Sequence, residues 1–120
     1  MKKIILSGDA PAPIGPYSQA ILVNETLYCS GQIAINGLDG DITAQTDDVC
    51  NSISAILAAA DMRLQDVVKA TCFLADMGDF SKFNDVYEKY FAHRPARSCV
   101  GAKGLPKGAL VEIEVIAVGD

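Results

Sequence analysis

The sequence TAQTDDVCNSISAILAAA, residues 43–60, determines the class of the fold. Its apolar side chains recur at intervals of three and four residues, which places them on one stripe of an α-helix about five turns long. This stripe consists of Val49, Ile53, Ile56, Leu57 and Ala60. The chain on either side of this helix changes to short apolar segments, the pattern typical of strands. The sequence therefore predicts a helix set among strands.

Strands are expected on both sides of this helix. The clearest segment is the last, where Val111, Ile113, Val115 and Ala117 alternate with Glu112, Glu114 and Ile116. Such alternation is typical of a strand with one buried face. The full set of predicted strands covers residues 2–6, 18–23, 26–30, 67–74, 98–103 and 109–118.

A second helix is predicted between Asp79, expected as its N-cap, and the stop at Pro95, because aromatic side chains recur there at helical spacing. The resulting order, β-β-β-α-β-α-β-β, predicts an α+β fold in which two helices pack on one face of a mixed sheet.

The other face of that sheet has no helix to cover it. The chain has 120 residues, which fits one domain spanning residues 1–120, and half of its residues are apolar. Two helices cannot bury so much apolar surface in a small domain. We therefore expect copies of the chain to pack their sheets together.

The N-terminus predicts a cytoplasmic protein. Its basic start is followed by only three apolar residues before Ser7-Gly8-Asp9, which is too short for an export signal. No apolar run approaches the roughly 18 residues that a membrane-spanning helix needs.

The net charge of −5 argues against a general nucleic-acid binder, because phosphate contacts need a basic face. The charge is uneven, with four basic and ten acidic side chains in residues 1–81 but six basic and five acidic in residues 82–120. The locally basic end suits a small anion, and chance clustering on the surface is the alternative.

Cysteine and histidine positions predict no metal site. Cys29, Cys50, Cys72 and Cys99 are widely spaced, and His93 is the single histidine, so no ligand pair has the usual zinc spacing. Buried reduced thiols are the simpler interpretation. A Ser-His-Asp or Cys-His site is excluded unless His93 itself is the base.

Arg97 is the most informative charged residue, because it enters an otherwise apolar strand. A guanidinium there is suited to a planar, bidentate anion such as a carboxylate. The alternative is an ion pair with Glu112 or Glu114 across the two final strands.

Four motifs carry a resemblance over essentially the whole chain. They are Gly-Pro-Tyr-Ser-Gln at residues 15–19, Ser-Gly-Gln-Ile at 30–33, Pro-Ala-Arg-Ser-Cys-Val at 95–100, and Leu-Pro-Lys at 105–107 followed by Glu-Ile-Glu at 112–114. In this order they resemble the Rid family of RidA/YjgF-like reactive intermediate deaminases. The resemblance implies a chorismate-mutase-like α+β fold and a homotrimer with a pocket at each subunit interface.

The resemblance also implies an activity, the hydrolysis of 2-imino acids such as 2-iminobutanoate and 2-iminopropanoate to 2-keto acids and ammonia, without a metal or organic cofactor. A small 2-imino or 2-keto carboxylate would be the ligand, and no nucleic acid or membrane would be a partner. A non-catalytic trimer that binds small carboxylates is one alternative. An endoribonuclease or translation inhibitor is another, disfavoured by the acidic charge and the single histidine.

Roles for individual residues follow from the same resemblance. Arg97 would hold the substrate carboxylate. The backbone carbonyl of Cys99 and the carboxylate of Glu112 would hold the attacking water and relay protons, although Glu112 could instead only pair with Arg97. The remaining substrate-binding residues would be Tyr17 from a neighbouring subunit, Ser30, the backbone amide of Gly31, and Asn84.

Overall fold

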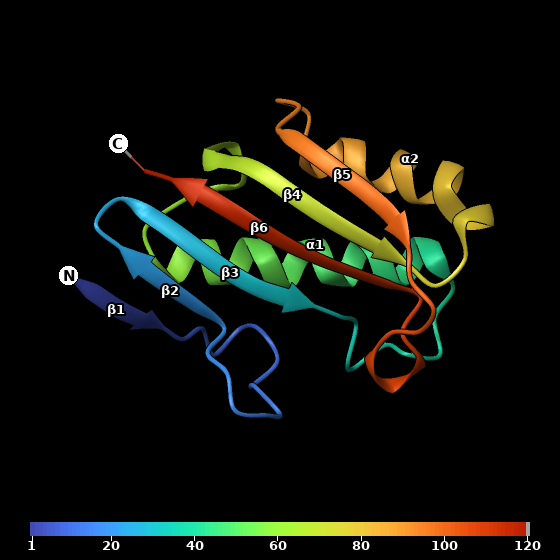
Figure 1. Ribbon diagram of the computed structural model, residues 1–120, viewed down its shortest axis with the longest axis horizontal. Coiled ribbons are helices and arrows are strands. Elements are labelled where there is room, and N and C mark those ends of the chain that lie inside the picture. The colour runs from blue at the N-terminus through green and yellow to red at the C-terminus, as the bar shows by residue number, and fades with distance from the viewer. Residues whose placement is uncertain (120) are drawn as a thin grey trace.

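The computed structural model describes residues 1–119, which form one six-stranded sheet and two α-helices (Figure 1). Three single turns of 3₁₀-helix occur in the connections. The regular elements are β1 (Lys2–Ile5), β2 (Ala20–Val23), β3 (Thr26–Gln32), α1 (Ile42–Ala59), β4 (Val67–Leu74), α2 (Phe80–Tyr90), β5 (Ala96–Gly101) and β6 (Val111–Val118).

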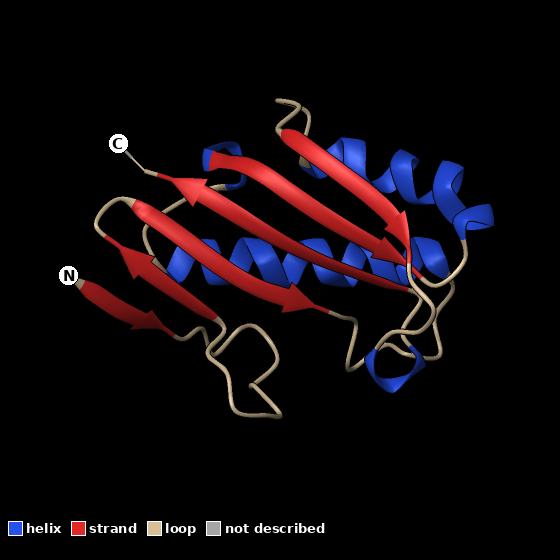
Figure 2. Ribbon diagram, in the orientation of Figure 1, coloured by secondary structure: helices blue, strands red, loops and turns tan. Residues whose placement is uncertain are grey.

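The strands lie in the order β1-β2-β3-β6-β4-β5. All neighbours are antiparallel except β4 and β5, which are parallel and joined by α2. Both helices cover the same face of the sheet (Figure 2). The predicted α+β architecture, a mixed sheet with two helices on one face, is confirmed.

Helix α1 begins one residue before the predicted segment and ends one residue before its end. Asp41 caps it, because its carboxylate accepts a hydrogen bond of 2.9 Å from the backbone N–H of Ala44. Four of the five residues in the predicted stripe are buried, and only Ala60, which follows the last turn, is partly exposed.

Helix α2 begins after Asp79, as predicted, but the Asp79 side chain makes no capping hydrogen bond. The capping interaction is made earlier, where the Asp76 carboxylate accepts a 2.8 Å hydrogen bond from the N–H of Gly78. This bond closes the 3₁₀ turn Met77–Asp79, which leads directly into α2.

The strand predictions are right in kind and differ mainly at the ends. Strand β4 has the predicted bounds, and in β6 the alternating set of Val111, Ile113, Val115 and Ala117 is buried. Strand β2 starts two residues later than predicted, β3 runs two residues further, and β5 covers residues 96–101 instead of 98–103.

A β-bulge interrupts β3. Cys29 pairs with Val115 and Gln32 pairs with Ile113, so three steps along β3 match two steps along β6. Without the extra residue, Cys29 and Gln32 would point to opposite faces, whereas both are buried. The bulge therefore lies at Ser30 and Gly31, between these two paired residues.

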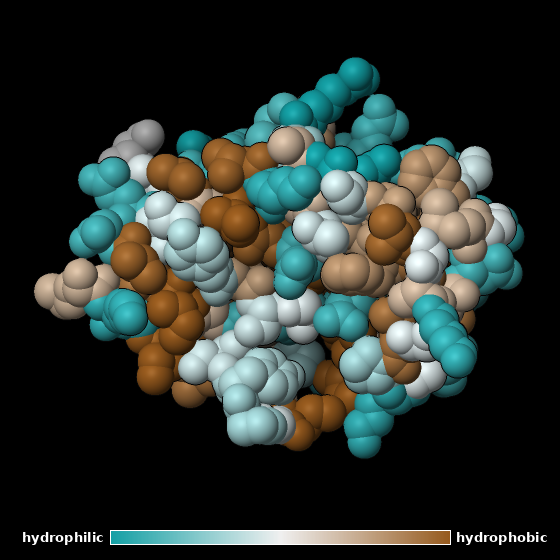
Figure 3. All heavy atoms as spheres, viewed as in Figure 1, coloured by the Kyte–Doolittle hydropathy of each residue, from teal (hydrophilic) through white to brown (hydrophobic). Residues whose placement is uncertain are grey.

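The sheet face opposite the helices is open and partly apolar. Ile4 is 69% exposed, Tyr28 50% and Val100 47%. The register places them on this face, which Figure 3 views directly and where apolar atoms gather over β1 and β2.

Among the described residues, no helix is long and apolar enough to cross a membrane.

Gln19 anchors the long loop between β1 and β2. Its buried side chain accepts a hydrogen bond of 2.6 Å from the N–H of Ser7 and donates to the carbonyls of Ser7 and Pro11, at 3.2 and 2.9 Å. One amide group thus satisfies three backbone groups that the prolines of this loop prevent from pairing in a sheet.

We expect Gln19→Ala to destabilise the fold by about 1–3 kcal/mol, because it leaves buried backbone groups without partners. Urea unfolding measures the loss, and limited proteolysis should locate new cleavage within residues 7–17. Gln65→Ala, at an exposed glutamine, is the control and should change neither result. Equal stability of the two variants would show that Gln19 does not anchor the loop.

Candidate functional site

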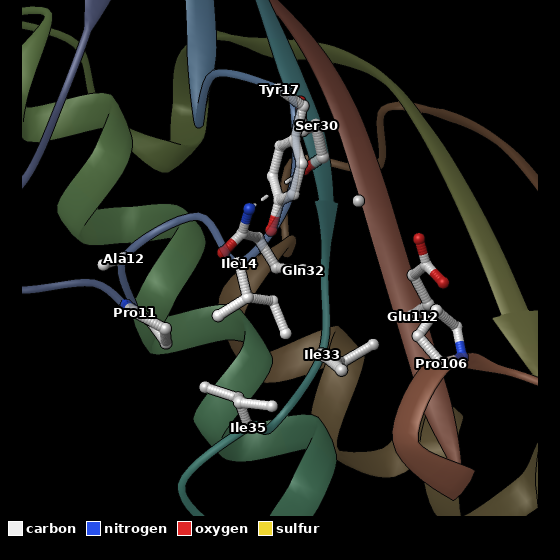
Figure 4. Close-up of a pocket in the computed structure, with 11 residues that line it drawn as sticks. Pro11, Ala12, Ile14, Tyr17, Ser30, Gln32, Ile33, Ile35, Pro106 and Glu112 are labelled. Carbon is white, nitrogen blue, oxygen red and sulfur yellow. Dashed lines mark hydrogen bonds between the residues drawn. The ribbon is translucent and has the colours of Figure 1, made fainter.

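Tyr17, Ser30, Gly31 and Glu112 line one pocket with a volume of about 280 Å³ (Figure 4). They come from the loop before β2, from the bulge in β3 and from β6. The structure thus brings together four of the predicted site residues from three distant parts of the chain.

Ser30 has a structural task in this pocket. Its hydroxyl donates a hydrogen bond of 2.6 Å to the carbonyl of Ser18, and its N–H donates to the carbonyl of Gln19 at 2.9 Å. These bonds attach the segment that carries Tyr17 to β3. The hydroxyl proton of Ser30 is therefore already engaged, and only its oxygen lone pairs remain for a ligand.

Gly31 lies against the carboxylate of Glu112. A Cβ atom built on Gly31 would overlap a carboxylate oxygen of Glu112 and lie 2.9 Å from its Cδ atom. Glycine at this position lets the carboxylate lie directly against the backbone of β3. A larger residue would force the Glu112 side chain out of its place.

The environment of Glu112 shifts the pKa of its carboxyl group upward. Partial burial raises the pKa of the Glu112 carboxyl above its usual value, and the nearby charge of Glu114 raises it further. A carboxyl group with a raised pKa is suited to exchange protons with a bound water or substrate.

The opposite wall of the pocket is apolar. Figure 4 shows Ile14, Ile33 and Ile35 on this side, away from Glu112, with Pro106 beside the carboxylate. An apolar wall facing one carboxyl group fits a small ligand with a short aliphatic part and a polar reacting end.

Arg97 lies elsewhere, on the helix-covered face of the sheet. Its Nη1 donates a hydrogen bond of 2.7 Å to Oδ1 of Asn84. Its guanidinium also lies over the aromatic rings of Phe80, Phe83 and Tyr87 on α2. Asn84 and these three aromatic residues follow the spacing i, i+3, i+4, i+7 on α2, so the four side chains form one stripe of the helix. Arg97 and Asn84 line a separate groove of about 380 Å³.

Cys99 lies two residues after Arg97 on β5 and is half-buried, whereas the other three cysteines are buried. All four are free thiols. Burial raises the pKa of the Cys99 thiol, although Arg97 opposes this effect. A thiol with a raised pKa is a poor nucleophile, so the side chain of Cys99 is not suited to attack a substrate.

The register shows that Arg97 and Glu112 point to opposite faces of the sheet. Arg97 pairs with Ala70, which is buried against the helices, whereas Glu112 pairs with Phe73, whose other neighbour is the exposed Val100. Strand β4 lies between β5 and β6, so the two final strands are not neighbours. The alternative in which Arg97 forms an ion pair with Glu112 or Glu114 across these strands is therefore wrong within one chain.

The remaining predictions concern metal ligands and the single histidine. Within residues 1–119, no group of three or more histidine, cysteine or acidic side chains is placed to hold a metal ion. His93 is exposed, with Nε2 at 2.9 Å from the carbonyl of Val67.

Tyr87 lines the Arg97 groove, although the sequence predicts it only as part of the second helix. Its spacing from Asn84 is the signal that could have placed it there, since residues three apart on a helix share a face.

The chain was compared with known proteins. The family model described as "Endoribonuclease L-PSP" matches residues 7–119. A Lactococcus lactis protein that carries the name of a regulator, AldR, is 53% identical, with 96% of both chains covered. The 2-iminobutanoate/2-iminopropanoate deaminase of Bos taurus is 46% identical, covering 98% of this chain and 90% of the bovine protein.

Solved structures that are similar to the chain in sequence also have the same fold. Escherichia coli TdcF with bound serine superposes with a TM-score of 0.94 at 36% identity, covering 98% of this chain and 99% of TdcF. Yeast Mmf1 gives a TM-score of 0.95 at 39% identity, with both chains fully covered at 100%. On this combination of family model, sequence identity and fold, the chain belongs to the endoribonuclease L-PSP family, also called the YjgF/RidA or Rid family.

Proposed function

We propose that the protein hydrolyses small 2-imino acids, such as 2-iminobutanoate and 2-iminopropanoate, to 2-keto acids and ammonia. The bovine relative at 46% identity carries the name of this activity. A site for such substrates needs a carboxylate anchor and a proton relay. Arg97, held on its aromatic platform, supplies the first, and Glu112, with its raised pKa, supplies the second.

One observation carries the proposed assembly, namely that these two groups lie on opposite faces of the sheet in one chain. A single copy therefore cannot direct both at one small substrate. We place Arg97 and Asn84 of one subunit opposite the Tyr17–Gly31–Glu112 pocket of the next, in a homotrimer whose open sheet faces pack together. The trimer buries the apolar surface that the helices leave exposed.

The chemistry follows from these positions. Arg97 binds the substrate carboxylate through parallel hydrogen bonds, and Tyr17 closes the pocket over the substrate. The Glu112 carboxylate and the backbone carbonyl of Cys99 hold a water molecule beside the imine carbon, with the N–H of Gly31 as a further donor. Glu112 accepts a proton from the water as the water oxygen bonds to the imine carbon, and returns this proton to the nitrogen, giving a carbinolamine. Glu112 then moves the hydroxyl proton to the amino nitrogen while the C–N bond breaks and the C=O bond forms, which releases ammonia and the 2-keto acid.

No metal or cofactor is required by this scheme, since the imine carbon is already electrophilic and needs mainly orientation and proton transfer. Residues 1–120 act as one domain, in the cytoplasm, on metabolites released there. The apolar wall of Ile14, Ile33 and Ile35 receives the aliphatic end of the substrate.

Two other functions remain as outcomes of the test. A carboxylate-binding regulator would use the same Arg97 clamp, and the name of the Lactococcus lactis relative points in this direction. An endoribonuclease, the activity in the name of the family model, would need a basic surface, whereas the chain has a net charge of −5.

Arg97→Lys keeps the positive charge but loses the second parallel hydrogen bond. We expect kcat/KM for freshly generated 2-iminobutanoate to fall roughly ten- to a hundredfold, the equivalent of about 1.5–3 kcal/mol for a charge-assisted hydrogen bond. Arg97→Ala should be less active still, with a nearly normal Tm. Release of ammonia and 2-ketobutanoate measures the reaction, and Lys82→Ala, which removes an exposed charge from α2, is the control.

Three results would contradict this assignment. Full activity of Arg97→Ala with a sharply lowered Tm would make Arg97 structural. Saturable binding of 2-ketobutanoate by the wild-type protein, with no release of ammonia, would show a binding protein. Cleavage of RNA by the wild-type protein that disappears in Arg97→Ala would favour the nuclease.

Gly31→Ala tests the role of the Glu112 carboxylate. The added methyl group overlaps the end of a flexible side chain, so we expect Glu112 to move and kcat to fall at least tenfold, while Tm changes little. Gly8→Ala is the matched control, because a Cβ atom at Gly8 meets nothing within 4 Å. Equal kcat for the two variants would exclude a catalytic Glu112 in this position.

A further inference from the structure

We propose that Tyr87 is the residue that positions Arg97: its aromatic ring fixes the plane of the guanidinium that receives the substrate carboxylate, and its hydroxyl takes no part. This inference rests on the carboxylate-binding role of Arg97 in the proposed function. It adds a residue that neither the motifs nor the resemblance had placed at the site.

The contact between Tyr87 and Arg97 is the closest of three. The Arg97 Cζ atom lies 4.8 Å from the centre of the Tyr87 ring, against 5.6 Å for Phe80 and 5.9 Å for Phe83. All three are within the range of a cation–π interaction, which extends to about 6 Å. Tyr87 is therefore the principal platform and the two phenylalanines flank it.

Asn84 completes the restraint from the same helix. The Tyr87 ring limits movement of the guanidinium out of its plane, while the hydrogen bond of 2.7 Å from Arg97 Nη1 to Asn84 Oδ1 limits rotation within it. A guanidinium has five N–H donors, so this bond leaves four for a carboxylate. Tyr87, Asn84 and Arg97 line the same groove, which keeps those donors within reach of a ligand.

The platform is itself held firmly. Tyr87 is only 7% exposed, and its ring stacks on that of Phe91 with centroids 4.5 Å apart. The ring of Phe83 also packs against that of Tyr87, with centroids 5.5 Å apart. A ring packed in this way cannot follow a mobile arginine, so the arginine must adapt to the ring.

Among residues 1–119, the Tyr87 hydroxyl has no hydrogen-bond partner, although its oxygen atom is buried. Burial raises the pKa of the Tyr87 phenol well above its usual value, and the nearby thiol of Cys72 acts in the same direction. The hydroxyl thus stays neutral and unpaired, and its removal should cost the protein nothing.

These properties predict a clear difference between two substitutions. Tyr87→Phe keeps the ring and should bind 2-ketobutanoate, the stable product of the reaction, as tightly as the wild type, with an equal or higher Tm. Tyr87→Leu removes the ring and should raise the Kd for 2-ketobutanoate and the KM for 2-iminobutanoate about tenfold, or 1.4 kcal/mol, with kcat changed less than about threefold. Calorimetric titration and the ammonia assay measure these values.

Leu27→Ala is the control for lost stability, because Leu27 is fully buried but lies on β3, which two strands separate from β5. We expect it to lower Tm as Tyr87→Leu does while leaving Kd near the wild-type value. Equal losses of affinity in Leu27→Ala and Tyr87→Leu would overturn the proposal, as would a Tyr87→Phe variant as weak as Tyr87→Leu.

The side-chain N–H resonance of Arg97 gives a readout that does not need activity. Identified by its disappearance in Arg97→Lys, this signal should be shifted by the ring in the wild type and in Tyr87→Phe, and should lose that shift in Tyr87→Leu. If the wild-type protein neither binds nor hydrolyses the ligands, the proposed function fails, and this spectrum still decides the positioning role. An Arg97 signal that is the same in all these proteins would overturn it.

Discussion

Strand β4 lies between β5 and β6, and the geometry of the site depends on this pairing. Side chains alternate between faces along each strand, so the register of β4 with its two neighbours directs Arg97 towards the helices and Glu112 towards the open face. The parallel pairing of β4 with β5 also requires a crossover, and α2 forms it. The same connection that satisfies the topology therefore supplies the residues that hold Arg97.

One surface of helix α2 both packs in the core and contacts Arg97. Phe83 and Tyr87 are buried in the core, yet both also face the guanidinium of Arg97. On the other side of the sheet, the bulge in β3 contains Gly31, whose lack of a side chain leaves room for Glu112, and Ser30, whose N–H is hydrogen-bonded to the carbonyl of Gln19. Each half of the proposed site is thus built on packing that the fold needs in any case.

Local patterns in the sequence predicted the elements well, because hydrophobic periodicity reports directly on which side of a helix or strand is buried. The bounds of β4 and the buried set of β6 are examples. The order of the strands could not be read in this way, since spacing along the chain says nothing about which strands are neighbours. The ion pair of Arg97 with Glu112 was therefore a reasonable alternative that the register excludes. The bulge, and the replacement of Asp79 by Asp76 as the capping side chain, depend on tertiary contacts.

A site shared between subunits can be tested by complementation. Arg97→Ala and Glu112→Ala chains, carrying different affinity tags, would be co-expressed, and the mixed trimers isolated on both tags. In a cyclic trimer with one site per interface, every mixed assembly contains one site with both residues intact, so the account predicts about one third of wild-type activity from two inactive parents. Mixed trimers that stay as inactive as either parent would show that Arg97 and Glu112 act from the same chain, and would contradict the account.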